Sequence, residues 1–369
     1  MHFIDLKKQY HLIETDILAS IKQVLDHGQY IMGPEIQQLE NTLAEFIGVK
    51  QVIANASGTD ALLMALLALD IGSEDEVITS PFSFFATAEM IALCQAKSVF
   101  VDIDPLTYTM DANQLEAAIT PKTKAIMPVS LYGQPADMET INKIAKKYGL
   151  PVIEDAAQSF GAKQGAKYSC ALSTIGCTSF FPSKPLGGYG DSGACFTDDE
   201  VLAERLREIR LHGQNGRYRH CRIGINGRMD TIQAAILLQK MTLFPEEIEL
   251  RQQVAVRYAD LLADCVNPPV ISPGNTSVFA QYTIEVPHRE QFQERMAGYG
   301  IPTAVHYPVA MHQQVALSSL GYRVGDFPHA EAASERVVSL PMHPYLSLED
   351  QQQITHAVKQ SLNSVLETA

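Results

Sequence analysis

One segment of the chain places a lysine among apolar residues and glycines: T-S-F-F-P-S-K-P-L-G-G-Y-G-D-S-G, residues 178–193. Most lysines in proteins are solvated surface groups. Lys184, however, follows Phe-Phe-Pro-Ser and precedes Pro-Leu. Apolar surroundings disfavour the charged ammonium form and lower the pKa of a lysine, so its amine becomes able to form an imine with a carbonyl carbon. The segment therefore indicates a chemically active lysine.

A carboxylate precedes this lysine at the end of a predicted buried strand. Asp155 closes the run P-V-I-E-D, residues 151–155, and ligands of open α/β sheets bind at the carboxyl ends of parallel strands. A carboxylate buried there needs a cation or a hydrogen-bond donor. The simpler interpretation is a helix cap, a position that favours Asp. Taken alone, the segment favours the cap.

The motif S-G-T-D, residues 57–60, joins a predicted strand to a predicted buried helix. We expect Thr59 to cap this helix, whose free N–H groups would bind an anion; for the motif alone, a plain cap is the simpler interpretation. Pyridoxal phosphate (PLP) requires an imine-forming lysine, a carboxylate at its ring nitrogen, an anion site and an aromatic ring. The sequence supplies all four in Lys184, Asp155, the Ser57–Thr59 turn with Ser179, and Phe84.

The glycine-rich loop also contains G-x-G-x-x-G, residues 188–193. This motif indicates a dinucleotide site only when it lies between a strand and a helix. Here it runs into A-C-F-T, which has the pattern of a strand, so a dinucleotide site is disfavoured.

The elements that position these residues alternate between short apolar strands and helices from residue 51 to residue 155. Such alternation predicts an α/β fold with a mainly parallel sheet between helices. Before it, residues 34–47 predict an amphipathic helix that ends at Gly48. Beyond about residue 245 the pattern changes and includes a predicted strand over 278–286. Because 369 residues exceed the usual size of one core, we expect a large domain, residues 1–245, and a smaller α+β domain, residues 246–369.

Composition excludes several classes of function. The formal net charge is −14 and the pI is about 5.2, which argues against nucleic acid or an anionic membrane as partner. No apolar run is long enough to cross a bilayer. The six cysteines have no metal-ligand spacing, so we expect no metal site, and they fit a reducing cytoplasm.

Together these segments closely resemble the DegT/DnrJ/EryC1/StrS family of sugar aminotransferases, and the resemblance covers almost the whole chain. The matching motifs include GQYIMGPEIQQLE, ASGTDAL, EVITSPFSFFATAE, FVDIDPLTYTMD, PVIEDAAQSFGA, SFFPSKPLGGYGDSGA, RMDTIQAAIL, PTAVHYP and LPMHPYL. The resemblance implies the type I aminotransferase fold, PLP as cofactor, and a homodimer with shared active sites.

The resemblance also implies roles for individual residues. Lys184 would hold the cofactor as an imine and carry protons, and Asp155 would pair with the pyridine nitrogen. Gln158 would hydrogen-bond the ring hydroxyl, and Phe84 would stack on the ring. The phosphate would be held by Gly58, Thr59 and Ser179, and by Asn226 of the neighbouring chain. One departure is Ser192, where many relatives have glycine; it matters only if that position needs a positive φ.

Within the family, the motifs imply transfer of an amino group from glutamate to the 3-keto position of a UDP-linked 2-acetamido uronic acid, a precursor of surface polysaccharide. Arg228 of the neighbouring chain could bind the uronate carboxylate, or it could form an ion pair between subunits. His306 and Tyr307 would contact the sugar, or pack between domains. The alternatives are a dTDP-3-keto- or UDP-4-keto-6-deoxyhexose as substrate, and a PLP-fold regulatory protein without turnover.

Overall fold

The structure is a computed structural model that describes the backbone of residues 1–366. A four-stranded and a three-stranded sheet are joined by parallel bridges from Ile126 to Val152 and from Val129 to Asp155. The resulting strand order is β1 (Gln51–Asn55), β9 (Gly193–Thr197), β8 (Ile175–Ser179), β5 (Ile153–Asp155), β4 (Thr123–Met127), β2 (Glu76–Thr79) and β3 (Lys97–Phe100). Of these strands only β9 runs against the others. The predicted mainly parallel sheet is confirmed.

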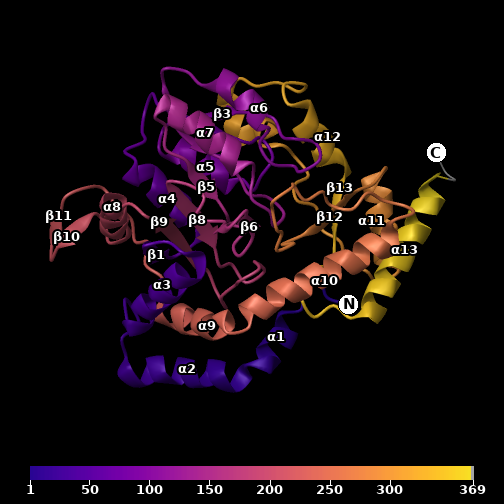
Figure 1. Ribbon diagram of the computed structural model, residues 1–369, viewed down its shortest axis with the longest axis horizontal. Coiled ribbons are helices and arrows are strands. Elements are labelled where there is room, and N and C mark those ends of the chain that lie inside the picture. The colour runs from indigo at the N-terminus through magenta and orange to yellow at the C-terminus, as the bar shows by residue number, and fades with distance from the viewer. Residues whose placement is uncertain (367–369) are drawn as a thin grey trace.

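Helices cover both faces of this sheet because both faces are apolar. Ile53 and Cys195 belong to the core beneath α4 (Gly58–Ala68), α5 (Ala86–Leu93) and α8 (Glu200–Arg210). Their neighbours Val52 and Phe196 face the opposite way, into the core beneath α3 (Pro34–Ile47) and α9 (Thr231–Met241). Successive strand residues point to opposite faces, so this alternation places helices on two sides (Figure 1). A further core lies under α6 (Ala112–Leu115), the 3-10 turn η1 (Glu116–Ala118) and α7 (Met138–Tyr148).

The predicted helix over residues 34–47 is α3, and it ends as expected at Gly48, whose φ is +80°. Two further helices precede it, α1 (Leu6–Leu12) and α2 (Glu14–His27). Helix α2 packs on α9 along the lower edge of the molecule in Figure 1. The N-terminal segment thus crosses the outside of the sheet domain before the first strand begins.

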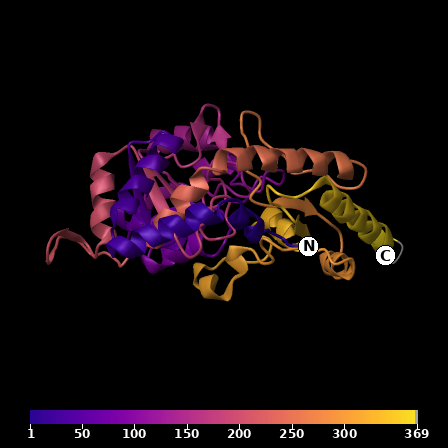
Figure 2. The same ribbon diagram turned by 90° about the horizontal axis from the view of Figure 1, so that it is seen from below.

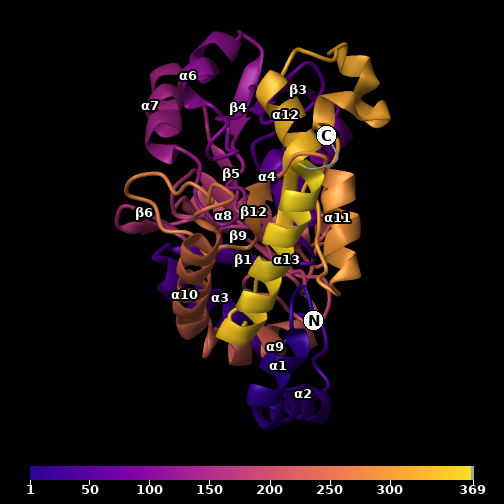
Figure 3. The ribbon, with the colours of Figure 1, turned by 90° about the vertical axis from the view of Figure 1, so that its right-hand side faces the viewer.

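The C-terminal part has its own apolar core, drawn from residues 254–362. It contains the antiparallel pair β12 (Tyr282–Glu285) and β13 (Val337–Leu340). Helix α13 (Leu348–Leu366) lies between α10 (Phe244–Leu262) and α11 (Arg289–Gly298), as Figure 3 shows. Residues 299–336 complete this part with η2 (Met311–Gln313), η3 (Val315–Leu320) and α12 (Pro328–Arg336).

Two short hairpins leave the body of the fold, β6–β7 (Lys163–Gln164, Lys167–Tyr168) and β10–β11 (Gln214–Gly216, Arg219–His220). The second projects beyond α8 at the end of the molecule away from α13 (Figures 1 and 2). Tyr218 and Ile223, in and beside this hairpin, are 80% and 85% exposed. Among the described residues, no helix is long and apolar enough to cross a membrane.

Candidate active site

A pocket of about 470 Å³ lies at the carboxyl ends of the parallel strands. Ser57 follows β1, Asp155 ends β5 and Ser179 ends β8, while His306 and Tyr307 reach the pocket from the C-terminal part. This is the edge at which open α/β sheets bind ligands. All the residues that the sequence singled out for a site line this pocket, except Asn226 and Arg228.

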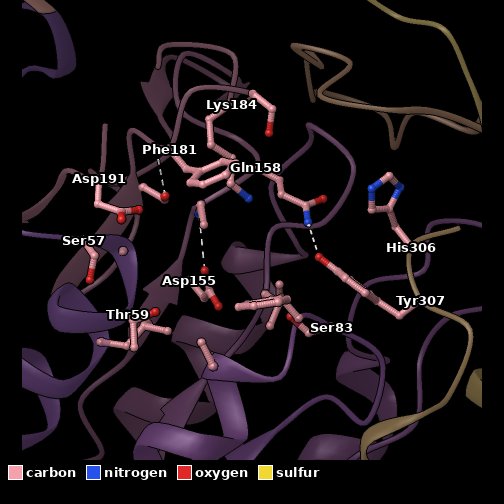
Figure 4. Close-up of a pocket in the computed structure, with 18 of the residues that line it drawn as sticks. Ser57, Thr59, Ser83, Asp155, Gln158, Phe181, Lys184, Asp191, His306 and Tyr307 are labelled. Atoms are coloured by element: carbon pink, nitrogen blue, oxygen red, sulfur yellow. Dashed lines mark hydrogen bonds between the residues drawn. The ribbon is translucent and has the colours of Figure 1, made fainter. Parts of the chain in front are cut away.

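Lys184 and Asp155 face each other across the pocket (Figure 4). The lysine lies in a turn after β8, in which the backbone N–H of Lys184 donates to the backbone carbonyl of Phe181 at 2.8 Å. Burial lowers the pKa of the Lys184 ammonium, and the nearby Asp155 opposes this shift. The predicted apolar shell is only partly correct, because Pro185 and Leu186 are buried but Phe181 is half exposed at the pocket wall.

Asp155 is buried and held by donors that the sequence did not reveal. Burial raises the pKa of its carboxyl group, whereas hydrogen bonds from Thr87 and the Ala157 N–H, and the charge of Lys184, oppose the rise. Thr87 Oγ1 donates to Asp155 Oδ2 at 2.7 Å and lies 3.0 Å from Ser83 Oγ. Asp155 Oδ1 also accepts from the backbone N–H of Ala157 at 3.3 Å. Residues 157–161 form turns and no helix follows β5, so Asp155 is not a helix cap. Thr87 is fully buried in α5, and no local pattern of the sequence pointed to it.

The start of α4 forms the opposite end of the pocket. Ser57, rather than Thr59, is the N-cap: its backbone is extended and its Oγ accepts from the Asp60 N–H at 3.0 Å. The prediction for Thr59 was wrong because the helix begins at Gly58, two residues before the start that a cap at Thr59 would require, and Thr59 lies at the pocket wall. A Cβ on Gly58 would lie 2.6 Å from Ser179 Cβ. Glycine thus lets Ser179 pack against the helix start, where free N–H groups attract anions.

A chain of hydrogen bonds fixes the third side of the pocket. Gln158 Oε1 accepts from the Tyr132 N–H at 2.9 Å, and Gln158 Nε2 donates to the Tyr307 hydroxyl at 3.0 Å. Tyr307 therefore keeps its own O–H to donate into the pocket, and burial raises its pKa. His306 Nδ1 lies 3.1 Å from Ser339 Oγ. Burial lowers the pKa of His306 to about 4, so its imidazole is neutral near pH 7.

Phe84 lies at the mouth of the pocket with more than half of its surface exposed, and its ring centre is 6.1 Å from that of Tyr307. An exposed ring at a pocket wall is free to stack on a flat ligand.

Asn226 and Arg228 instead line a neighbouring cavity of about 430 Å³, which shares Asp191 with the main pocket. The single chain does not bring these two residues to Lys184.

The glycine-rich loop after Lys184 packs around other parts of the protein rather than around a dinucleotide. It leads into β9, as the sequence predicted. A Cβ on Gly188 or Gly190 would lie 2.8 Å from the side-chain amide of Gln233, and one on Gly193 would lie 2.6 Å from the Ser57 carbonyl. Ser192 is buried and has no positive φ, so the departure from glycine at this position leaves the loop unstrained.

The chemistry of this donor set fits PLP. A lysine with a lowered pKa faces a buried carboxylate, an anion-binding helix start lies at one end, and an aromatic ring lies at the wall. Within residues 1–366 no three His, Cys, Asp or Glu side chains gather as metal ligands would. Fold and pocket together define a PLP-dependent enzyme of the type I aminotransferase class.

Residues 11–359 match the DegT/DnrJ/EryC1/StrS aminotransferase family, and the chain belongs to this family. It is 55% identical over 347 residues to the UDP-2-acetamido-2-deoxy-3-oxo-D-glucuronate aminotransferase of Pseudomonas aeruginosa, with 94% of this chain and 96% of the relative covered.

Solved structures show the same fold. A DegT/DnrJ/EryC1/StrS aminotransferase from Brucella abortus superposes with a TM-score of 0.95 at 44% identity, covering 98% of this chain and 99% of the other. NtdA from Bacillus subtilis, solved with the bound cofactor PMP, gives a TM-score of 0.89 at 34% identity, covering 95% of this chain and 82% of the other. The resemblance seen in the sequence is confirmed, and the protein is a PLP-dependent aminotransferase.

Proposed function

We propose that the enzyme transfers the amino group of glutamate to the 3-keto position of a UDP-linked 2-acetamido uronic acid. The observation that carries this proposal is the 55% identity, over nearly the whole of both chains, to an aminotransferase named for such a substrate. The product would be a 3-amino sugar nucleotide, and glutamate would leave as 2-oxoglutarate. We place this reaction in the cytoplasm, in the synthesis of surface polysaccharide precursors.

Lys184 is the proposed catalytic residue. Bound PLP supplies an aldehyde that links covalently to amines and a ring that withdraws electrons from the carbon beside the nitrogen. Because burial lowers the pKa of Lys184, its amine is available both to bind the aldehyde carbon and to take up a proton. Lys184 lies in the same pocket as Asp155, and with PLP bound it would carry a proton between the substrate carbon and the cofactor carbon in each half of the reaction.

The other pocket residues hold and orient the cofactor. Asp155, kept in place by Thr87, would hold the proton on the pyridine nitrogen. Gly58, Thr59 and Ser179 would bind the phosphate at the start of α4, and Phe84 would stack on the ring. Gln158 donates one N–H of its side-chain amide to Tyr307, and we propose that the second N–H donates to the ring hydroxyl.

The active unit is proposed to be a homodimer. Asn226 of the partner subunit would complete the phosphate site, and Arg228 of the partner subunit would bind the uronate carboxylate in a bidentate contact. Among the described residues Arg228 Nε has no hydrogen-bond partner, and Arg228 lines a cavity beside the main pocket. Both observations support a role toward the partner subunit. His306 and Tyr307 would contact the sugar from the C-terminal part.

We also propose that the chain divides functionally near residue 245, into a cofactor-binding domain (1–245) and a smaller domain (246–369). Residue 245 lies at the start of α10, and a separate apolar core uses residues 254–362. The last three residues of the smaller domain lie outside the described part. A second core joins residues 82–132 to residues 310–337, so the two parts also pack together around the pocket.

The test is to give the purified enzyme glutamate and a small panel of keto sugar nucleotides. We expect turnover on the 3-keto uronate, and its loss in Lys184→Ala with at least a ~10³-fold fall in kcat, the range associated with removal of an essential catalytic group. A Lys184→Ala enzyme with normal turnover would contradict the assignment. Preference for a 6-deoxy analogue, unaltered by Arg228→Ala, would support the 6-deoxyhexose alternative, and no turnover on any sugar would support a regulatory role.

A further inference from the structure

A second, narrow cavity lies behind the loop that carries Lys184. Pro182, Lys184 and Pro185 form one wall, and the rest comes from the N-terminal arm (residues 4–9), from α9 and α10, and from residues 343–345. The arm is attached there by backbone and side-chain contacts. The Met342 N–H donates to the Phe3 carbonyl at 3.2 Å, and Lys8 Nζ donates to the Tyr345 carbonyl at 3.1 Å. The L-P-M-H-P-Y-L segment therefore belongs to the support of the lysine loop.

The cavity is lined by polar side chains that the proposed reaction does not use. Gln9, Lys240, Glu247, Arg251 and His343 are each at least nine-tenths buried. Gln9 Nε2 donates to Glu247 Oε1 at 2.6 Å, and the Tyr345 hydroxyl donates to the same oxygen. Burying so many polar groups is costly unless each finds a partner. These residues therefore form a built polar site.

Three atoms of this site have no hydrogen-bond partner in the part of the chain that the structure describes: Gln9 Oε1, Arg251 Nε and His343 Nδ1. The first is an acceptor and the second a donor. Burial, with Arg251 nearby, lowers the pKa of His343 to about 4, so its ring is neutral and Nδ1 can accept or donate. The cavity leaves about 20 Å³ for the centre of a water molecule, and about 10–15 Å³ is enough for one.

We propose that one ordered water occupies this cavity, joins Gln9, Arg251 and His343, and makes Gln9 a positioning residue for the loop that carries Lys184. A water molecule donates two hydrogen bonds and accepts two, so it matches this mixture of donor and acceptor atoms. An anion would leave the Gln9 oxygen unpaired, and a cation would leave the arginine N–H unpaired. The N-terminal arm thereby braces the lysine loop from the side opposite the pocket.

This inference rests on the proposed role of Lys184. Because the lysine acts in both half-reactions, a loosened loop slows both and leaves the binding of either substrate unchanged. The predicted signature is a fall in kcat per bound cofactor with an unchanged KM. A general loss of stability lowers the number of cofactor-loaded sites and leaves the rate at each remaining site unchanged.

The experiment compares Gln9→Met with Lys7→Met. Methionine has nearly the size of glutamine but lacks its hydrogen-bonding amide, whereas Lys7 is exposed on the same helix and does not line the cavity. We expect kcat of both half-reactions to fall about tenfold in Gln9→Met, the effect of about 1.4 kcal/mol, and to stay within about twofold in Lys7→Met. His343→Leu, measured in the same way, is the second variant if Gln9→Met does not fold.

A high-resolution structure of the unaltered holoenzyme provides a test that needs no variant. We expect a density peak within hydrogen-bond distance of Gln9 Oε1, Arg251 Nε and His343 Nδ1. An empty cavity, or variants of Gln9 and His343 with unchanged rates, overturns the inference while leaving the proposed function intact. If Lys184→Ala remains active, the proposed function itself fails.

Discussion

Gly58 and Ser179 show how closely the anion end of the pocket is packed. Ser179 lies where a Cβ on Gly58 would stand, at 2.6 Å from its own Cβ. Any larger residue at position 58 must push the end of β8 away from the start of α4. The proposed phosphate site therefore depends on the absence of a single methyl group, and so does the spacing between this site and Lys184, which follows Ser179 in the chain.

Gly58→Ala should weaken cofactor binding by about tenfold or more, because overpacking of this kind costs about 1–3 kcal/mol. The measurement is a cofactor titration followed by absorbance. Gly72→Ala is the matched control, since a Cβ at Gly72 meets nothing within 4 Å and the residue has no positive φ. Equal affinity in the two variants would show that the start of α4 does not hold the cofactor.

At this scale the sequence was informative where function requires an unusual residue type. Lys184 among prolines and phenylalanines and Asp155 at a strand end could both be predicted. Thr87 could not, because it lies 68 residues from Asp155 and meets it only through packing of α5. The cap of α4 was misassigned because Ser and Thr have similar preferences for that position, and only the extended backbone of Ser57 distinguishes them.

Among the elements, α9 is unusual because it buries a lysine in its last turn. Lys240 is 1% exposed, and its ammonium lies 4.9 Å from the centre of the Tyr189 ring. Burial lowers its pKa from 10.5 to about 8, although Glu247 opposes the shift. The folded protein therefore holds the Lys240 ammonium in buried surroundings that disfavour its charge at neutral pH.

Lys240→Met should raise the free energy of unfolding at pH 7 by about 2 kcal/mol. Removing the buried charge gains roughly 3 kcal/mol, judged from the pKa shift, and losing the contact with the Tyr189 ring costs about 1 kcal/mol. Below pH 8 the lysine is charged in both states and the full cost applies. Between pH 8 and 10.5 the unfolded chain binds more protons, so the wild type gains stability as the pH rises. Urea unfolding across this range should show the two proteins converging; a constant difference would contradict the prediction.

The elements themselves were largely predictable, because their apolar patterns are strong. Helix α3 was predicted with its bounds and its terminating glycine. The strand expected over residues 278–286 was predicted too long, and β12 begins only at Tyr282. The cause is Phe279, which adopts a φ of +42° where its segment packs against Gly133. Gly133 and Phe279 are far apart in the chain, so the local sequence pattern does not indicate their contact.

For the whole molecule, two features support a second copy of the chain at the end that carries the β10–β11 hairpin. One is the cavity that Asn226 and Arg228 line, and the other is the exposure of Tyr218 and Ile223. The proposed shared sites make a specific prediction. Mixing inactive Lys184→Ala with inactive Arg228→Ala after subunit exchange should restore about a quarter of the wild-type sites, since half of the dimers are mixed and each has one intact site. Activity that stays absent on mixing would mean that Arg228 serves the pocket of its own subunit.

The contact between the N-terminal arm and the segment around Tyr345 also limits how the protein can be made. Lys8 and Tyr345 are 337 residues apart in the chain. During translation the N-terminal arm therefore cannot bind its site until almost the entire polypeptide has been synthesised. Contacts of such long range form late and slowly. A ribosome-bound chain that lacks its last fifty residues lacks the wall that residues 343–345 give to the cavity behind Lys184, and it lacks the carbonyl that accepts from Lys8. The nascent enzyme should therefore acquire a fully braced lysine only close to the moment of release.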